Sequence, residues 1–331
     1  MTPQPRLTIV MYHYVRPLSR TRFPRIKALD LDRFRGQLEY LLRHYQIVSG
    51  TQVIAAARGP GGSTWDLPPN AALLTFDDGY ADHFDYVFPL LDEARLPACF
   101  FPPSATILDR TLLDVNRIHY ILAAVDDCRS VVDEIFDRLD RHRSQYALKR
   151  NEELYAEYAA ASRFDPAEVI FVKRILQKGL PEDLRRQIAG ELFARFVTAD
   201  ERAFSEELYM SLPQLRLLRR QGMYVGSHGH AHHWLGRLSP EAQERDVRLS
   251  LNMLEEVGTD TSSWIMCYPY GDSDESLRRL LPKMGCTVGL TTEVGIASSQ
   301  SQALLLPRLD TNDLPCDPKA EPSPWTVQLR T

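Results

Sequence analysis

Short apolar runs alternate with amphipathic stretches along most of this chain, and this alternation constrains the fold more than any other feature. The runs we assign as strands are Leu7–Tyr14, Ala72–Phe76, Ala98–Pro102, Met223–Ser227, Trp264–Tyr268 and Thr287–Thr291. Between them, residues such as Asp32–His44 and Leu238–Val257 carry apolar side chains at helical spacing, the latter after the cap Ser239. Strands that alternate with helices form parallel sheets, so the pattern predicts an α/β fold.

The segment from about residue 104 to residue 207 differs from the rest of the chain. It has little strand signal and is rich in charged, amphipathic stretches. The dipeptide Pro102-Pro103 precedes it, and Leu212-Pro213 marks the return to the alternating pattern. We therefore expect a single domain over residues 1–331 with a helical insertion at about 104–207. Such an insertion could be a lid over a site, a packing annex or an oligomer surface.

Two adjacent carboxylates, Asp77 and Asp78, follow directly after the apolar run Ala71–Phe76. Active sites of parallel α/β folds are built at this end of the strands, and two like charges there need a cation or a shared proton. Neighbouring side chains of an extended strand point to different sides, so one acid could bind a metal while the other moves a proton. A solvated turn is the other interpretation, because Asp78-Gly79 is a common turn dipeptide.

Four of the nine histidines fall within residues 228–233. His228 and His232 are four apart, so both imidazoles would face the same side if this segment is a helical turn. Two imidazoles and one carboxylate are a three-ligand set for a catalytic zinc, with a fourth position open to water. A surface histidine tract with adventitious metal affinity is the alternative, and spacing alone leaves other pairings open.

Three motifs in this order resemble those of the polysaccharide deacetylases, the NodB-homology carbohydrate esterases. Thr75–Gly79 matches a first motif Thr-Phe-Asp-Asp-Gly, and His228 with His232 matches a second motif His-x-x-x-His. Cys267–Gly271 resembles a third motif, Arg-x-Pro followed by Tyr or Phe. The resemblance implies a distorted (β/α) barrel and a divalent metal ion.

The resemblance also implies a role for each matching residue. Asp77 corresponds to the general base, and Asp78, His228 and His232 correspond to the metal ligands. Tyr270 corresponds to the residue whose backbone amide stabilises the oxyanion. Zn²⁺ suits two imidazoles and a carboxylate, although Co²⁺, Ni²⁺ or Mn²⁺ would fit similar ligands. We further expect Tyr80, Pro269 and Tyr270 to contact the substrate.

The chain departs from the family pattern at three points. Cys267 stands where the family has the arginine that orients the base, and Arg308 is our candidate substitute. Gly229 stands where Ser or Thr is usual, so one hydrogen bond is lost or is supplied by Ser227. No histidine follows His233 to match the late histidine that is the general acid of many members. Either the acid comes from elsewhere, with His13 at the end of the first strand as our candidate, or water protonates the leaving group. A buried structural role for His13 is equally open.

Composition narrows the class of partner. The net charge of −5 gives no basic surface for nucleic acid, and 44% apolar residues suffice for a sizeable core. Neither a signal-peptide pattern nor a membrane-spanning apolar window is found. The five cysteines are odd in number and show no close pairing, which favours reduced thiols in a reducing compartment. We expect a cytoplasmic protein; the oligomeric state stays open.

The leading hypothesis is a metal-dependent hydrolase that removes an N-acyl group, most simply N-acetyl, from an amino sugar of a glycan or a lipid- or nucleotide-linked precursor in surface polysaccharide biosynthesis. One alternative is a metal-independent amidohydrolase of the same fold. Another is a degenerate, non-catalytic carbohydrate-binding protein, because the usual Arg and late His are missing.

Overall fold

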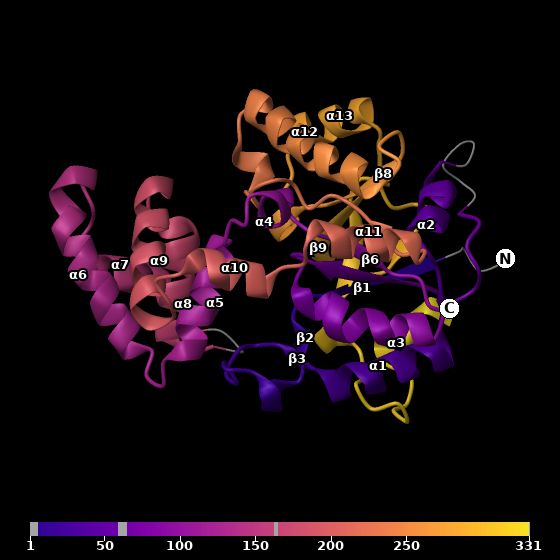
Figure 1. Cartoon of the computed structure of the whole chain (residues 1–331), viewed down its shortest axis with the longest axis horizontal. Helices are drawn as coiled ribbons and strands as arrows, with labels where there is room; N and C mark the ends of the chain where they lie inside the picture. The colour runs from indigo at the N-terminus through magenta and orange to yellow at the C-terminus, as the bar shows by residue number, and fades with distance from the viewer. Residues whose placement is uncertain (1–5, 59–64, 162–164, 331) are drawn as a thin grey trace. The chain divides into compact units, whose positions relative to one another are not determined.

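The chain, seen here in a computed structural model, divides into two compact units (Figure 1). Residues 6–58, 65–161 and 165–330 are described. The first unit comprises Met1–Pro17, Ala28–Thr111 and Glu206–Thr331, and the second comprises Leu18–Lys27 and Leu112–Ser205. Compactness alone does not say whether two units fold together, so the single domain over residues 1–331 stays a prediction.

A curled parallel sheet forms the centre of the first unit. Among the described residues it has nine strands, with the path β7-β6-β5-β1-β11-β9-β8, while β4 pairs with β5 and β10 pairs with β1. The strands of this sheet are β1 (Arg6–Tyr12), β4 (Gln46–Ile47), β5 (Ala71–Asp77), β6 (Cys99–Phe101), β7 (Tyr224–Val225), β8 (Trp264–Cys267), β9 (Cys286–Val294), β10 (Ala297–Ser298) and β11 (Leu306–Asp310). All pairings are parallel except β1 with β10. The predicted α/β class is confirmed.

Strand β5 lies in the middle of this sheet because its residues can be buried on both faces. All seven of its side chains are buried, as expected for a central parallel strand. Its register with β1 pairs Tyr12 with Phe76, so the ends of the two strands lie next to each other. The two ends of the strand path also meet, through a parallel bridge between Ser227 and Met266. The carboxyl ends of these strands therefore face one mouth.

Helices surround the sheet of the first unit. They are α1 (Leu31–His44), α2 (Gly50–Ala57), α3 (Phe88–Glu93), α4 (Ser104–Leu108), α11 (Leu212–Arg220), α12 (Pro240–Val257), α13 (Glu275–Leu280) and α14 (Pro324–Arg330). Figure 1 shows α12 and α13 side by side. The hydroxyl of Ser239 caps α12 by accepting a bond from the amide of Ala242, as its sequence predicted. A short pair of strands, β2 (Val15–Arg16) and β3 (Leu29–Asp30), forms a separate ribbon.

Several elements differ from the sequence-based assignment. The first strand ends at Tyr12 rather than Tyr14, and a π-helical turn, His83–Val87, directly precedes α3. Strand β11 had not been assigned, because Pro307 and Arg308 interrupt its apolar pattern. Burial of Arg308 against an acidic partner, described below, is what allows a strand there.

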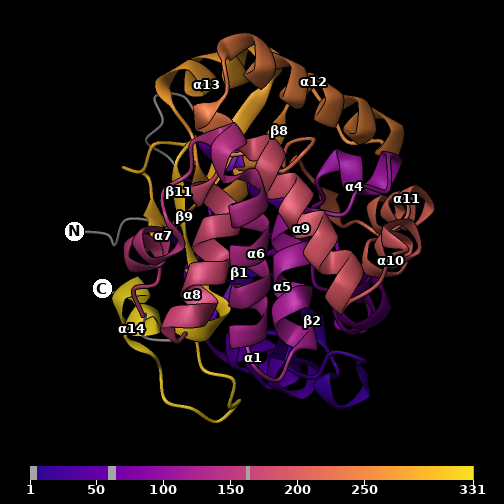
Figure 2. The ribbon, with the colours of Figure 1, turned by 90° about the vertical axis from the view of Figure 1, so that its left-hand side faces the viewer.

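The second unit is helical among its described residues. Its helices are α5 (Asp114–Ala124), α6 (Arg129–Tyr146), α7 (Asn151–Tyr158), α8 (Ala167–Arg174), α9 (Glu182–Phe196) and the start of α10 (Glu201–Leu208). Figure 2 shows α5, α6, α8 and α9 packed side by side. Arg117 of α5 donates two hydrogen bonds to the carboxylate of Glu201, at 2.9 and 2.6 Å. Across both units, none of the helices in the described ranges combines the length and apolar character needed to cross a membrane.

Candidate active site

The acidic pair lies where β5 ends and the chain turns sharply. Asp77 is the last residue of the strand, while Asp78 has a φ of 68° and Gly79 a φ of 70°. A Cβ at Gly79 would lie 2.6 Å from the Cβ of Pro102, so only glycine fits this turn. The two carboxylates diverge because Asp78 is left-handed, and not because the strand remains extended, as the sequence-based argument assumed.

Asp77 forms a buried ion pair with Arg308 of β11. The Arg308 Nη1 donates to Asp77 Oδ1 at 3.0 Å, and Nη2 lies 2.8 Å from Oδ2. Nε of Arg308 donates to the carbonyl of Thr291 at 2.7 Å, and Nη1 also donates to the hydroxyl of Thr75 at 3.2 Å. Both charged side chains are about fully buried, each with 1% of its residue surface exposed. Arg308 thus lies where the missing third-motif arginine would be needed; its part in catalysis stays a prediction.

The ion pair controls the protonation of Asp77. Burial raises the pKa of Asp77, but the guanidinium of Arg308, and after it the imidazoles of His228 and His13, outweigh burial and lower that pKa to about 2. Asp77 is therefore ionised at neutral pH despite being buried.

Asp78 uses its two oxygens differently. Oδ2 accepts a 2.6 Å hydrogen bond from the hydroxyl of Tyr80. Oδ1 faces the Nε2 atoms of His228 and His232, at 3.4 and 3.3 Å. It is buried and accepts no hydrogen bond of ordinary geometry from any described residue. A buried carboxylate oxygen that has no hydrogen-bond partner and lies beside two imidazole nitrogens is an environment suited to a cation.

The geometry of these three atoms fits a metal ion. Ligands of a tetrahedral zinc at about 2.0–2.1 Å lie roughly 3.3 Å from one another, which matches the two distances from Asp78 Oδ1. The Nδ1 of His228 lies 2.6 Å from the carbonyl oxygen of Cys267, which can only accept. Nδ1 of His228 therefore carries a proton, so Nε2 is the ring atom that would serve as the ligand of an ion beside Asp78. Asp78, His228 and His232 are thus able to hold a divalent ion.

The segment that carries the two histidines is a loop, so the expected helical turn is wrong. It follows β7, and both Gly229 and His232 have left-handed φ values, 68° and 56°. The imidazoles nevertheless meet, with ring centroids 4.9 Å apart. The hydroxyl of Ser227 accepts a 3.1 Å hydrogen bond from the amide of Gly229. Ser227 is the residue that we considered as a replacement for the usual Ser or Thr at position 229.

Tyr80 does not line a surface, which corrects its predicted contact with substrate. Its residue exposure is 0%, and its ring lies between Tyr14 and Tyr209, with centroids at 4.1 and 6.1 Å. Burial is the physical reason for the correction, since a sugar cannot reach the ring. The hydroxyl of Tyr80 instead fixes Asp78.

Tyr270 lies next to the candidate metal ligands. Its backbone is left-handed, with φ 58° and ψ 9°, and its ring packs against that of His232, with centroids 4.7 Å apart and planes inclined by 67°. The same ring stacks on Trp234, with centroids 4.3 Å apart and planes inclined by 6°. Tyr270 is partly exposed, whereas Pro269 is buried and shapes the turn instead of offering a surface, which corrects the contact expected of it. Contact between Tyr270 and substrate stays a prediction.

His13 lies at the same mouth of the sheet. It directly follows Tyr12, whose β5 partner Phe76 precedes Asp77, and it is partly exposed. Its carbonyl accepts a 2.8 Å hydrogen bond from Nε2 of His83. Burial lowers the pKa of His83 to about 4, so this second imidazole is a neutral donor that holds the loop carrying His13. An acid role for His13 stays a prediction.

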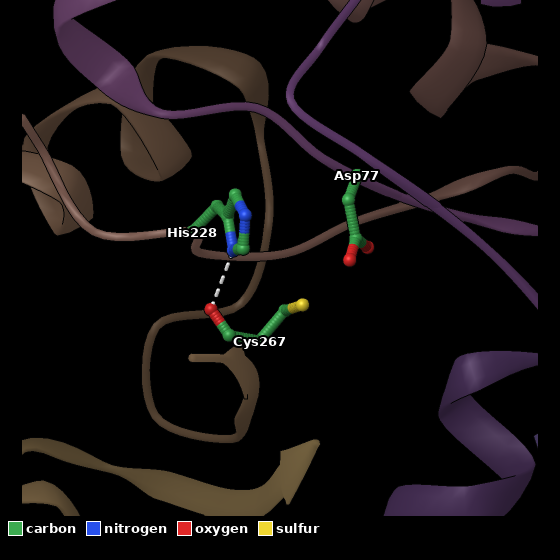
Figure 3. A group of neighbouring side chains, drawn as sticks. All are labelled: Asp77, His228 and Cys267. Atoms are coloured by element: carbon green, nitrogen blue, oxygen red, sulfur yellow. Dashed lines mark hydrogen bonds between the residues drawn. The ribbon is translucent and has the colours of Figure 1, made fainter. Parts of the chain in front are cut away.

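A second group with ligand atoms close together consists of Asp77, His228 and Cys267 (Figure 3). It is less suited to a cation, because Arg308 already neutralises Asp77. Burial raises the pKa of the Cys267 thiol, which disfavours the thiolate that a metal requires. Figure 3 also shows the bond between His228 and the Cys267 carbonyl. That bond orients His228 for the first group.

Comparison with known proteins identifies the family. The family model described as polysaccharide deacetylase matches residues 65–138 and 194–289, just over half of the chain, and includes both motifs that supply Asp78, His228 and His232. The chain belongs to the polysaccharide deacetylase family. The matched ranges leave out most of the helical second unit.

Individual relatives are more distant. Poly-beta-1,6-N-acetyl-D-glucosamine N-deacetylase of Escherichia coli K12 is 37% identical over 79 residues, which are 24% of this chain but only 11% of that protein. The structure resembles the Streptococcus pyogenes deacetylase PplD in complex with acetate, with a TM-score of 0.57, 17% identity and 98% of each chain covered. It also resembles IcaB from Ammonifex degensii, with a TM-score of 0.53, 17% identity and 93% and 92% covered. These likenesses confirm the predicted deacetylase fold.

Sequence reasoning missed two residues that touch the site region. Trp234 supports Tyr270, and Asp246 of α12 contacts the histidine loop. Asp246 had a detectable signal. It falls on the buried stripe of its helix, among Gln243, Val247 and Ser250, where an unpaired acid would be costly.

Proposed function

We propose that this deacetylase is a metal-dependent hydrolase that removes an N-acyl group, most simply N-acetyl, from an amino sugar of a glycan or glycan precursor in surface polysaccharide biosynthesis. The observation that carries the proposal is the orphaned Oδ1 of Asp78, buried between the Nε2 atoms of His228 and His232. The adjacent ionised Asp77 supplies the base that amide hydrolysis needs. The curated relative that acts on an N-acetylglucosamine polymer supports the substrate class.

The ligand set favours zinc, and cobalt, nickel or manganese would suit the same donors. A divalent ion held by Asp78, His228 and His232 supplies Lewis acidity and lowers the pKa of a water molecule at the site. Tyr80 keeps Asp78 oriented through its 2.6 Å hydrogen bond.

The other residues of the site would act as base, oxyanion donor and acid. Asp77, fixed by Arg308, accepts a proton from the attacking water. The backbone amide of Tyr270 donates to the oxyanion. His13 donates a proton to the leaving nitrogen as the C–N bond breaks, so that the products are a carboxylic acid and an amine. The cytoplasmic location stays a prediction and plays no part in this chemistry.

The first test combines metal content with amine release. We expect the purified protein to hold about one divalent ion, and to release amine from acetylated glucosamine oligosaccharides. A strong chelator should abolish amine release, and zinc or cobalt should restore it. Asp78→Asn and His228→Ala should lose the metal and at least roughly 10²-fold of kcat/KM, because each removes one of three ligands.

His142→Ala is the matched control, since it removes a histidine of α6 in the second unit. It should retain metal and activity. Full activity after complete removal of metal would contradict the proposal and favour a metal-independent amidohydrolase. Retention of glycan without amine release, by metal-loaded protein, would favour a binding protein.

A further inference from the structure

The loop between the two candidate metal ligands is held by a carboxylate from a different element. Oδ1 of Asp246, on α12, accepts a 2.7 Å hydrogen bond from the amide of His230. Oδ2 accepts a 3.2 Å bond from the amide of Ala231. Asp246 is 5% exposed, so this carboxylate is buried against two successive amides that no helix or strand would satisfy.

Other polar groups of the same loop are bonded by residues at the start of α4. The amides of Ser104 and Ala105, at the start of α4, donate to the carbonyls of Gly229 and His230 at 3.1 and 3.0 Å. The hydroxyl of Ser104 lies 2.8 Å from Nδ1 of His230. Donors from α4 and acceptors from α12 thus fix the same few residues. The loop needs such support because it has left-handed backbone at both Gly229 and His232.

Gly229 is what allows Asp246 to approach. A Cβ at position 229 would lie 2.8 Å from Oδ1 of Asp246, closer than the two atoms can pack. The left-handed φ of 68° also disfavours a side chain there. Glycine in place of the usual Ser or Thr is therefore coupled to the carboxylate on α12.

We propose that Asp246 is a positioning residue for the metal centre, and that Gly229 and Asp246 act together to fix the loop that presents His228 and His232. This inference rests on the proposed function, because it concerns the ligands named there. An imidazole ligand displaced by a fraction of an ångström loses much of its contribution, so outer contacts of this kind typically change metal affinity about 10–100-fold.

The sharpest substitution is Asp246→Asn, which keeps the size of the side chain. Its amide oxygen can accept one backbone N–H, but its NH₂ group then faces the second N–H, donor against donor. We expect the apo variant to remain folded by near-ultraviolet circular dichroism. Its zinc affinity, measured by competition with a chromophoric chelator, should fall about 10–100-fold. The absorption spectrum of the cobalt-loaded variant should also change, because that spectrum reports ligand geometry.

Glu244→Gln is the matched control, because it makes the same chemical change on an exposed position of the same helix. It should leave zinc affinity and the cobalt spectrum as in the wild type. Gly229→Ala should weaken zinc binding, as Asp246→Asn does. The double variant should lose less binding free energy for zinc than the sum of the two single losses, because both substitutions act on one contact.

The outcomes separate this inference from the proposed function. Wild-type protein that binds neither zinc nor cobalt overturns the proposed function and the role of Asp246 with it. Wild-type binding that His228→Ala abolishes, with Asp246→Asn binding zinc as tightly and with an unchanged cobalt spectrum, overturns the role of Asp246 alone. A lower melting temperature of apo Asp246→Asn with unchanged zinc binding would also overturn it, because it shows a purely structural role.

Discussion

Asp77 is a charged group in a place where charge is costly. Moving a carboxylate from water into a protein interior costs several kcal/mol unless a partner compensates. Arg308 is that partner. Its Nη1 and Nη2 contact the two carboxylate oxygens, Nε donates to the carbonyl of Thr291, and Nη1 also donates to the hydroxyl of Thr75. The result is a carboxylate that stays ionised and has one fixed orientation, as the proposed base requires. Its low pKa also makes it a weak base, which suits only a proton made acidic by its surroundings.

Replacing Arg308 with Gln tests this dependence. Without the guanidinium, burial dominates and the pKa of Asp77 rises, so the acid limb of the pH–rate profile should move to higher pH. The lowered pKa stabilises the folded protein above the ordinary carboxyl pKa, and this contribution is lost as pH falls toward 2; the variant should lack it. We expect about 3–5 kcal/mol of destabilisation at pH 7, measured by urea unfolding, and at least a roughly 10²-fold loss of kcat.

Arg248→Gln provides the comparison, because Arg248 pairs with Glu244 at the surface of α12. Arg248→Gln should lower the free energy of unfolding by no more than about 0.5 kcal/mol and leave the pH–rate profile unshifted. An unshifted acid limb in Arg308→Gln would show that Asp77 does not set the activity. Arg308→Lys should recover charge but not the two-point contact, and so should recover stability more than kcat.

At the scale of elements, the turn after β5 decides where the two carboxylates point. A left-handed Asp78 followed by a left-handed Gly79 turns Asp78 toward His228 and His232 while Asp77 stays in line with the strand. The turn passes against Pro102, just after β6, the next strand of the sheet. The close approach of Gly79 to Pro102 therefore restrains the position of Asp78, the candidate metal ligand.

Gly79→Ala should break this constraint. The new Cβ would meet Pro102 at 2.6 Å and the φ of 70° would be strained. Gly222→Ala is the control, because its φ is 84° but no atom lies within 4 Å of its built Cβ. We expect about 1–2 kcal/mol of destabilisation in Gly222→Ala from strain alone, and a further ~1–3 kcal/mol in Gly79→Ala from the clash.

Urea unfolding of the two glycine variants measures these costs, and zinc affinity measures the effect on the site. Only Gly79→Ala should bind zinc more weakly, since only its clash displaces Asp78. Equal stability losses in the two variants would show that the contact with Pro102 does not restrain the turn.

At the scale of the whole molecule, the candidate ligands and the tryptophans share one unit. Trp65, Trp234, Trp264 and Trp325 are the four tryptophans of the chain, and all lie in the first unit, as do Asp78, His228 and His232. Tryptophan fluorescence therefore reports unfolding of the unit that would bind metal. Circular dichroism in the far ultraviolet reports the helices of both units.

Zinc should accordingly raise the midpoint of the fluorescence transition. A ligand at 100 times its Kd, bound only by the folded state, adds about 2.7 kcal/mol of stability. We expect this shift in wild-type protein and its absence in His228→Ala, with chemical unfolding followed by both signals. An equal shift in His228→Ala would place the zinc elsewhere in the molecule.

The sequence by itself determined the features that depend on local pattern. Strand β5 and its acidic end, helix α12 with its cap, and the histidine pair could all be read from apolar runs and motif spacing, because these are set by neighbours in the chain. Fold class followed from the alternation of strands and helices. The resemblance to a known family then supplied roles that spacing alone had left open.

Only the tertiary structure decided which distant residues complete the site. Arg308 and Asp77 are 231 residues apart in the chain. They meet because β11, which carries Arg308, is separated in the sheet only by β1 from β5, which ends at Asp77. Asp246 reaches the histidine loop because α12 packs there and residue 229 has no side chain. Tyr80, which we expected to contact the substrate, is buried and bonded to Asp78. Compensation of buried charges is a property of three-dimensional neighbours, and a linear pattern does not record it.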